Sequence, residues 1–205
     1  MDASCLCAYP AWLPGETFFS LCSRLHFLSG HLSPAATTEQ LFSLSEQSIK
    51  HDLPCGLDAF ELNTAGRWGR AISIIEHHTI FPFFAPFQSD RSVAEALAQI
   101  RSPSIGPLKY QLGLVCGGFG ADHPLRACPS CMVRDVVLYG VSYWHLLHQY
   151  PGVVVCPEHS EVLCECIQNR RWCGRFTWTM PSVDTLRDSD HGVITSLERE
   201  RLAQL

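Results

Sequence analysis

The chain has 205 residues, of which 46% are hydrophobic and 10% aromatic, so it is long and apolar enough to bury a sizeable core. Its net charge of −5 argues against a general polyanion binder whose whole surface attracts phosphate. The longest apolar stretch, residues 72–87, is interrupted by Glu76, Pro82 and Pro86, so it cannot span a bilayer and we expect a soluble protein.

The start of the chain and its cysteines indicate a compartment. The sequence begins Met1-Asp2-Ala3-Ser4, without the basic and apolar segments of a secretory signal, and its cysteine count of 11 is odd. Both features disfavour a disulfide framework. We therefore expect a reducing cytoplasm, where thiols persist and compete well for zinc.

The first hundred residues predict a helical region that resembles a helix-turn-helix. Apolar residues at helical spacing predict a helix over 16–28, and Thr37-Thr38-Glu39-Gln40 resembles a capping box that opens a second helix through Leu44 and towards Ile49. Similar patterns predict helices over 57–62, 68–77 and 92–101.

The segments between and after these helices are less regular. Residues 80–87, which we call the aromatic strap, combine four phenylalanines with Pro82 and Pro86, and we expect a buried, extended segment rather than a helix. Residues 108–116 fit either a strand or a helix, and the glycines of 117–120 predict a hinge.

A metal-ligand pattern follows this hinge: Cys128-x2-Cys131 and, after residues 132–155, Cys156-x2-His159. A chain segment with two ligands three positions apart can turn around one ion. We call Cys128–Cys131 the first knuckle and Cys156–His159 the second, and together they make one tetrahedral zinc site. Four protein ligands leave no open position for water or substrate, so we predict one structural zinc ion. Buried free thiols or disulfides are the alternative.

The residues around this pattern allow further predictions. We expect a helix over 136–150, packed on the metal site, and a short strand over 152–155. Downstream, Cys164, Cys166 and Cys173 resemble an incomplete second zinc site without an evident fourth ligand; buried free cysteines are the preferred interpretation. From residue 183 the chain is polar, and 196–202 resembles the start of a helix.

These patterns divide the chain into three parts. We predict a helix-turn-helix-like domain over 1–116, a zinc-finger module over 117–180 and a polar helical tail over 181–205, giving a mainly α fold with a small zinc-ribbon or zinc-finger module that holds the Cys3His site.

The basic residues are concentrated in the second half of the chain. Residues 1–100 hold five lysines and arginines against ten carboxylates, whereas residues 101–175 hold seven against five. Any phosphate contact should therefore come from the second half. The candidates for DNA-backbone contact are Lys109 and three arginines near two tryptophans, with ordinary solvated surface as the alternative: Arg170, Arg171 and Arg175.

Four segments occur in an order and at a spacing that resemble one known family. They are Leu13-Pro14-Gly15-Glu16-Thr17 with Ser23-Arg24-Leu25, residues 78–87, Cys128-Pro129-Ser130-Cys131 continuing to Tyr143-Trp144-His145, and residues 148–153 leading to Cys156-Pro157-Glu158-His159. Together they resemble the TniQ/TnsD family of transposon target-selection proteins over about residues 9–165.

This resemblance implies a non-enzymatic, DNA-associated adaptor in the bacterial cytoplasm, at the nucleoid. Family members recognise a target, either by binding an attachment site directly or by riding on a CRISPR effector, and recruit the AAA+ ATPase TnsC, which licenses the transposase. The implied partners are thus a TnsC-like ATPase, double-stranded DNA and, in the second of these two modes, a CRISPR effector complex. Many relatives are longer, so we expect either a short family member or a truncated one.

Two other functions compete with this interpretation. A zinc-containing helix-turn-helix transcription regulator is disfavoured by the acidic balance of residues 1–100, because phosphate contacts supply much of the affinity for DNA. A metal or cysteine hydrolase would need an open zinc position or an activated nucleophile. Glu158 beside His159 offers a base, but nothing in the sequence frees a zinc ligand.

Overall fold

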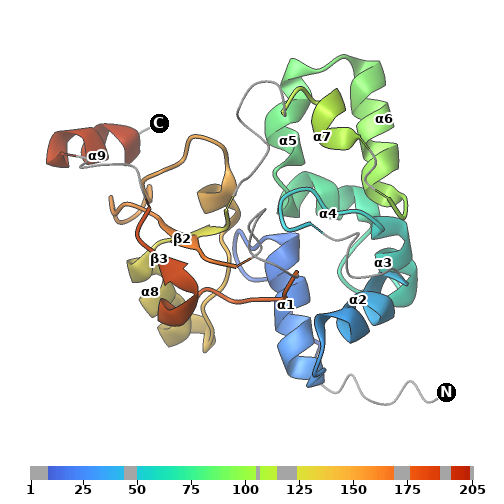
Figure 1. Cartoon of the computed structure of the whole chain (residues 1–205), viewed down its shortest axis with the longest axis horizontal. Coiled ribbons are helices and arrows are strands. Elements are labelled where there is room, and N and C mark those ends of the chain that lie inside the picture. Colours follow the sequence, from blue (N-terminus) through green and yellow to red (C-terminus); the bar gives the residue numbers. More distant parts are fainter. Residues whose placement is uncertain are drawn as a thin grey trace.

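A computed structural model of the protein describes residues 9–43, 50–104, 107–114, 124–168, 176–189 and 195–203 (Figure 1). In chain order its elements are α1 (Phe18–Ser29), α2 (Pro34–Phe42), α3 (Leu57–Asn63), α4 (Ala71–His78), α5 (Phe81–Phe84), the 3₁₀ helix η2 (Ala85–Phe87), α6 (Asp90–Arg101), α7 (Leu108–Gln111), β1 (Arg126–Ala127), α8 (Pro129–Tyr139), η3 (Leu146–Gln149), β2 (Cys164–Cys166), η4 (Val183–Thr185), β3 (Leu186–Arg187) and α9 (Ser196–Ala203). The predicted fold class, mainly helical with a small module around the Cys3His residues, is confirmed.

The first helix forms where the sequence predicts it, because both of its ends are capped. Thr17 is the N-cap of α1, and its Oγ1 accepts a hydrogen bond of 3.1 Å from the backbone N–H of Ser20. Gly30 ends the helix in the left-handed conformation, at φ 65°. The predictions for α3, α6 and α9 are also confirmed, α4 forms but begins at Ala71 instead of residue 68, and residues 108–111 form the helix α7.

The predicted start of the second helix is wrong. Helix α2 begins one turn earlier, at Pro34, and Ser33 is its N-cap. Pro is well suited to the first position of a helix, because its missing N–H would have no partner there. Thr37 is instead a buried residue within the helix, which ends at Ser43 in a left-handed conformation with φ 54°. The predicted extension over 44–49 lies outside the described residues.

The aromatic strap is also not the extended segment that its prolines suggested. It forms α5 and η2, and Pro82 and Pro86 each lie in the first turn of one of these helices. Phe81 and Phe84 are buried in the core, whereas Phe87 is 79% exposed. The two prolines start short helices instead of breaking one long helix.

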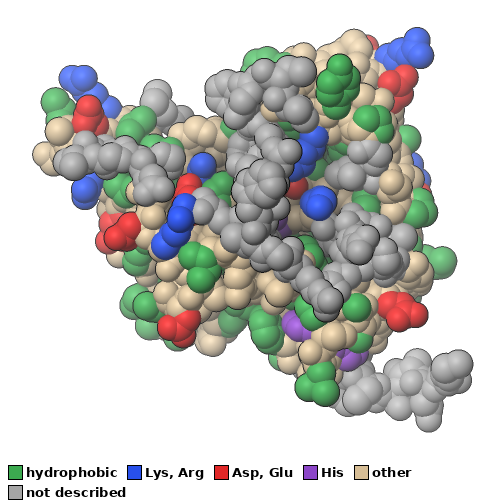
Figure 2. All heavy atoms as spheres, viewed as in Figure 1, with side chains coloured by type: hydrophobic (Ala, Val, Ile, Leu, Met, Phe, Trp, Pro, Cys, Tyr) green, Lys and Arg blue, Asp and Glu red, His purple; other side chains and the backbone are tan. Residues whose placement is uncertain are grey.

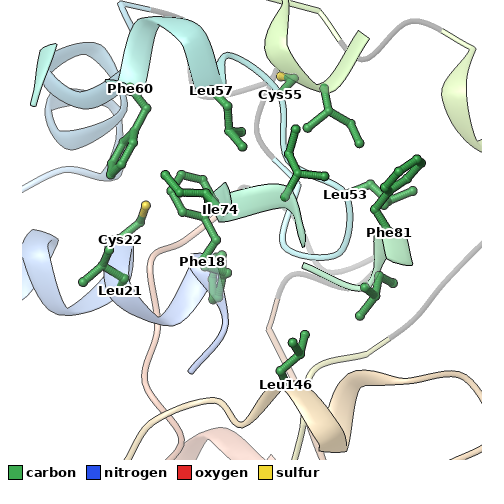
Figure 3. Close-up of a cluster of buried hydrophobic side chains, with 14 of the residues drawn as sticks. Phe18, Leu21, Cys22, Leu53, Cys55, Leu57, Phe60, Ile74, Phe81 and Leu146 are labelled. Carbon is green, nitrogen blue, oxygen red and sulfur yellow. The ribbon is translucent and has the colours of Figure 1, made fainter. Parts of the chain in front are cut away.

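A large apolar core joins the helices to the second half of the chain. Phe18 packs edge-on against Phe60, with ring centroids 4.8 Å apart. Figure 3 shows this cluster and, at its lower edge, Leu146, which reaches it from the later part of the chain. Trp178 stacks on Phe19 with centroids 5.4 Å apart. The proposed domain boundary between 116 and 117 stays a prediction, although the core draws on residues from both sides of it.

The second half of the chain contains a small antiparallel sheet in the order β1-β2-β3. Arg126 pairs with Glu165, and Glu165 pairs with Arg187, so one carboxylate lies between two guanidinium groups. The predicted strand over 152–155 is reduced to a single bridge between Val155 and Val162.

The helix predicted over 136–150 is wrong. Helix α8 starts at the first knuckle and ends at Tyr139, followed by Gly140 in the left-handed conformation at φ 76°. The chain then runs extended to η3. The predicted hinge at 117–120 lies outside the described residues, and among those that are described no helix is long and apolar enough to cross a membrane.

Candidate metal centre

The four predicted ligands converge on one point. The donor atoms of Cys128, Cys131, Cys156 and His159 all lie within 4.8 Å of one another. The Sγ atoms of Cys131 and Cys156 are 3.6 Å apart. Nδ1 of His159 lies 3.3 Å from Sγ of Cys131 and 3.6 Å from each of the other two sulfur atoms.

These distances fit a tetrahedral zinc ion. Zinc bonds of about 2.3 Å to sulfur and about 2.0–2.1 Å to nitrogen place two sulfur atoms about 3.8 Å apart and a sulfur and a nitrogen about 3.6 Å apart. A disulfide would instead require an S–S distance of about 2.0 Å. The cysteines are therefore arranged as ligands and not as a disulfide, and the donor set is one that zinc prefers.

Local backbone structure positions each ligand pair. Cys128 is the N-cap of α8 and Cys131 lies in its first turn, which Pro129 begins, so both sulfur atoms belong to one turn and lie within the same donor group. The second pair lies on a tight turn in which the N–H of Ser160 donates to the carbonyl of Cys156 at 2.9 Å. Ser160 has a positive φ of 53°, which allows the chain to reverse after His159.

Little apolar packing surrounds the ligands. The cluster of buried residues at the site consists of the three cysteines and Leu163, with Val153 packed against it. We call residues 125–166 the metal module. Because so small a cluster buries little apolar surface, ligation of a metal is the strongest interaction available to hold the two knuckles together.

The three thiols influence one another's ionisation. Hydrogen bonds with Cys128 and Cys156, together with burial, raise the pKa of the Cys131 thiol well above its usual range. Hydrogen bonds from Cys128 and Cys131 lower the pKa of Cys156. A bound divalent ion would favour ionisation of all three thiols.

A carboxylate that the sequence reasoning missed supports the first knuckle. Glu161 accepts hydrogen bonds from the N–H and Oγ of Ser130, at 3.3 and 2.7 Å, and from Sγ of Cys128 at 3.3 Å. Its position at the N-terminus of α8 also suits a negative charge. Hydrogen bonding by Ser130 lowers the pKa of Glu161. No spacing rule links Glu161 to Cys128, because the contact is long-range.

Two histidines near the ligands have supporting roles. Nε2 of His145 bonds Oδ2 of Asp135 at 2.7 Å, and its ring stacks on Tyr143. Nε2 of the buried His148 lies 3.9 Å from Sγ of Cys131. Asp135 was missed in the sequence, although it follows Cys131 by four positions and so lies on the same helix face. Neither histidine belongs to the four-donor group.

The possible second zinc site is not supported by the part of the chain that the structure describes. Cys164 and Cys166 lie on β2 outside the four-donor group, and Cys173 lies outside the described residues. The four-residue cluster is the one group of metal-binding side chains found among the described residues.

The predicted DNA contacts stay predictions. Arg170, Arg171 and Arg175 lie outside the described residues. Lys109 donates a hydrogen bond to the buried Asp52, so much of its charge is already balanced within the protein. On the face shown in Figure 2, Lys and Arg side chains are spread out rather than gathered into one basic patch.

The residues that lead into α1 form hydrogen bonds with the segment that connects α8 to η3. The N–H of Thr17 donates to the carbonyl of Trp144 at 3.0 Å, and the N–H of Leu146 donates to the carbonyl of Gly15 at 2.7 Å. The hydroxyl of Tyr143 donates to the carbonyl of Pro14 at 2.9 Å. We call this pairing of residues 14–17 with 143–146 the seam.

A buried ion pair fixes the shape of the seam. Glu16 is fully buried and accepts two hydrogen bonds from the guanidinium of Arg24, at 2.8 and 2.7 Å. Nδ1 of His78 donates to the carbonyl of Glu16 at 2.8 Å, and its ring stacks on Trp12. The segments that predicted a family resemblance therefore meet in space.

Comparison with known proteins identifies similarities over most of the chain. The TniQ family model matches residues 8–163, a span that includes α1, the seam and all four ligands. The transposon Tn7 transposition protein TnsD of Escherichia coli is 25% identical over 157 residues, which are 76% of this chain. The chain spans only 31% of the length of that relative.

Proposed function

The chain belongs to the TniQ family, and from this membership we propose that it is a non-enzymatic adaptor in transposition, which brings a TnsC-like AAA+ ATPase to target DNA and so leads to recruitment of the transposase. The observation that supports this proposal most is the family match across the seam and the ligand cluster. The similarity to a transposition protein places the proposal in the context of that machinery. The proposed location is the bacterial cytoplasm, at the nucleoid.

In this proposal the ligand cluster holds one structural zinc ion. Cys128, Cys131, Cys156 and His159 would supply all four ligands, and three of them are buried. A catalytic zinc keeps one position for water or substrate, whereas a structural zinc is fully ligated by protein. The ion would supply folding energy, and the side chains around it would fix α8 and the second knuckle.

The helix-turn-helix regulator remains a weaker alternative. Helix α2 contains Glu39 and no basic residue, and α3 contains Asp58 and Glu61 and no basic residue. A recognition helix in the major groove needs cations for the phosphates beside its base contacts. These two helices are therefore poorly suited to bind DNA by themselves.

Reconstitution with the ATPase tests the proposed function. A TnsC-like ATPase from a transposon of the same kind would be assembled on double-stranded DNA with ATP or a non-hydrolysable analogue, and capture of the full chain would be measured by co-sedimentation. We expect capture in at least one nucleotide state and none on DNA alone at moderate salt. If neither nucleotide state captures the chain, the adaptor proposal is wrong.

A further inference from the structure

Helix α8 exposes apolar side chains that a helix of a folded protein usually buries. Of its eleven residues only Cys131 and Asp135 are buried. Val137 is 79% exposed, and four more apolar side chains of the helix are exposed as well: Val133, Val136, Leu138 and Tyr139. Isolated exposed apolar residues are common, but five on two turns of one helix are not.

Three of these five side chains lie on one face of the helix. At about 100° per residue, Val133, Val136 and Val137 fall with Pro129 within an arc of about 100°, which we call the apolar stripe. Met132, beside this arc, packs against the core. Cys131 and Asp135, which face the metal site, lie outside this arc. The buried Cys131 and Asp135 thus face the metal site, whereas the apolar stripe is exposed on another side of the helix.

A groove borders the same stripe. It has a volume of about 320 Å³ and lies between the first turns of α8 and the segment of η4 and β3. Its walls are mainly apolar and include Pro129 and Met132 on one side and Val183 and Leu186 on the other. In Figure 1, α8 lies beside β3 on the side of the molecule away from α3 and α6. Figure 2 shows hydrophobic side chains at the surface in this lower left region. We call the stripe and the groove together the α8 surface.

The charges at the edge of the α8 surface are predominantly acidic. Asp188 lines the groove, and Asp184 directly follows its Val183 wall. Both are exposed, and neither forms an ion pair with another residue in the described ranges. Arg187 also lines the groove, but it pairs with Glu165 at 3.6 Å. A partner with basic side chains at its edge would match these charges.

The size and charge of the surface favour a helix of another protein over a second copy of this chain. An eleven-residue helix is about 16 Å long, so the stripe and groove match one short partner helix in length, whereas a stable complex of two folded chains buries roughly 800 Å² on each partner. Two copies related by a two-fold axis would also bring Asp184 and Asp188 of each into the same small interface. Like charges at such an interface oppose association.

We infer that the α8 surface is a docking site for an amphipathic helix of a partner protein, with apolar residues at helical spacing and lysine or arginine along one edge. The apolar stripe would receive the apolar face of that helix at an interaxial distance of about 8–10 Å, and the groove would receive one of its large side chains. This inference deepens the proposed function, because the TnsC-like ATPase is the partner assigned to the surface.

A synthetic helix tests the surface without the ATPase. The probe is a fluorescent peptide of about 15 residues with leucines at helical spacing and lysines elsewhere, and a second peptide has glutamates in place of the lysines. Binding to the full, zinc-loaded chain is measured by fluorescence anisotropy. We expect the lysine peptide to bind and the glutamate peptide to bind about tenfold more weakly or not at all.

Matched variants separate the α8 surface from general attraction to an acidic protein. Val137→Glu should weaken binding of the lysine peptide by about tenfold, whereas Leu62→Glu should leave it within about twofold. Val137 and Leu62 are both 79% exposed, so the two variants introduce the same charge at equally accessible sites. Asp184→Lys together with Asp188→Lys should also weaken binding. Equal binding by all variants, or equal binding of both peptides, overturns the inference.

A photo-crosslinking amino acid at position 137 then identifies the occupant. With the ATPase present, we expect a crosslink to a basic, amphipathic helix of the ATPase, and none from the same group placed at position 62. A crosslink mainly to a second copy of the chain overturns the inference in favour of self-association. If the peptide binds as expected but the ATPase is not captured by the unaltered chain, the α8 surface is retained and the proposed function is wrong.

Discussion

The helical region and the metal module are stabilised in different ways. Helices α1 to α6 enclose the aromatic cluster around Phe60, which packs against Phe18 and Phe42 and is fully buried. Around the ligands of the metal module the buried cluster consists of three cysteines and Leu163, and other buried side chains of the module, such as Leu125 and Trp144, belong to the main core. In the helical region, stability comes from apolar area removed from water, whereas around the ligands it should come from ligand bonds.

This difference shows why α8 can leave its apolar face exposed. A helix in the helical region must bury its apolar residues to be stable, as α1 does with Phe18 and Leu21. Helix α8 is attached instead by Cys128 and Cys131 at its first turn. A helix fixed through its ligands needs less packing, so its outer face is available to a partner.

Removal of one ligand should have the largest effect and separate the two regions. Structural zinc contributes about 10–16 kcal/mol of apparent binding free energy in zinc-finger peptides, so Cys156→Ser should abolish stoichiometric zinc and unfold the metal module. Metal content is measured by mass spectrometry, and hydrogen exchange shows which segments lose protection. We expect β1, α8 and residues 153–163 to exchange rapidly while α3 and α4 stay protected.

A neighbouring cysteine provides the control for this experiment. Cys164 lies on β2 as a half-buried free thiol outside the four-donor group. Cys164→Ser should therefore retain one zinc ion per chain. Full zinc content in Cys156→Ser would contradict the assignment of the ligands. Loss of zinc in Cys164→Ser would instead support a zinc site that includes Cys164.

A cavity in the core of the helical region should lower the stability of that region and leave zinc binding unchanged. Phe60→Ala removes a ring that contacts Phe18, Phe42 and Trp68, and such a cavity costs about 3–5 kcal/mol in the free energy of unfolding. Urea unfolding measures this loss. Leu62→Ala, two positions along the same helix and exposed, should change stability by no more than about 0.5 kcal/mol. Reduced zinc content in folded Phe60→Ala would show that the two regions are not separable.

The sequence predicted those parts of the molecule whose signals are local. The ligands Cys128, Cys131, Cys156 and His159 were found because each pair is close in sequence and forms its own turn. Helix α1 was found because its apolar residues recur at helical spacing, and its caps at Thr17 and Gly30 agree with that prediction. For α5 and α2 the signals were present but misinterpreted, since a proline can begin a helix as well as break one.

The parts that could not be predicted depend on distant residues. The apolar residues of 143–146 fit a predicted helix, but their backbone pairs with residues 14–17 and is therefore extended. Glu161 and Ser130 likewise meet only when the second knuckle folds back. Tertiary contacts of this kind override local propensity, and a single sequence does not show them.

The ion pair between the buried Asp52 and Lys109 should make the stability of the helical region depend on pH. Burial would raise the pKa of Asp52, but the charges of His51 and Lys109, with hydrogen bonds from Lys109 and the Leu53 amide, lower it to about 2. A carboxylate with a lowered pKa stabilises the fold above its unfolded pKa of about 4, and this contribution is lost as the pH falls towards 2.

Asp52→Asn should therefore destabilise the protein by about 2 kcal/mol at pH 7, and the difference from the unaltered chain should shrink between about pH 4 and pH 2. Urea unfolding at several pH values measures the difference. The exposed Asp58, which pairs with Arg101, is the control, and Asp58→Asn should change stability little. A difference that is constant down to pH 2 would show that the Asp52 charge is not the cause.

The smallest expected effect is at the seam, where the two regions share a backbone contact. Thr17→Ala removes the side-chain cap of α1 and should cost about 1 kcal/mol of unfolding free energy, which Thr17→Ser should restore. The seam itself uses the N–H of Thr17, which donates to Trp144 in either variant. Zinc affinity, measured by competition with a chelator, should therefore be unchanged in Thr17→Ala. A weaker zinc affinity would mean that the cap of α1 stabilises the metal module through the contacts of the seam.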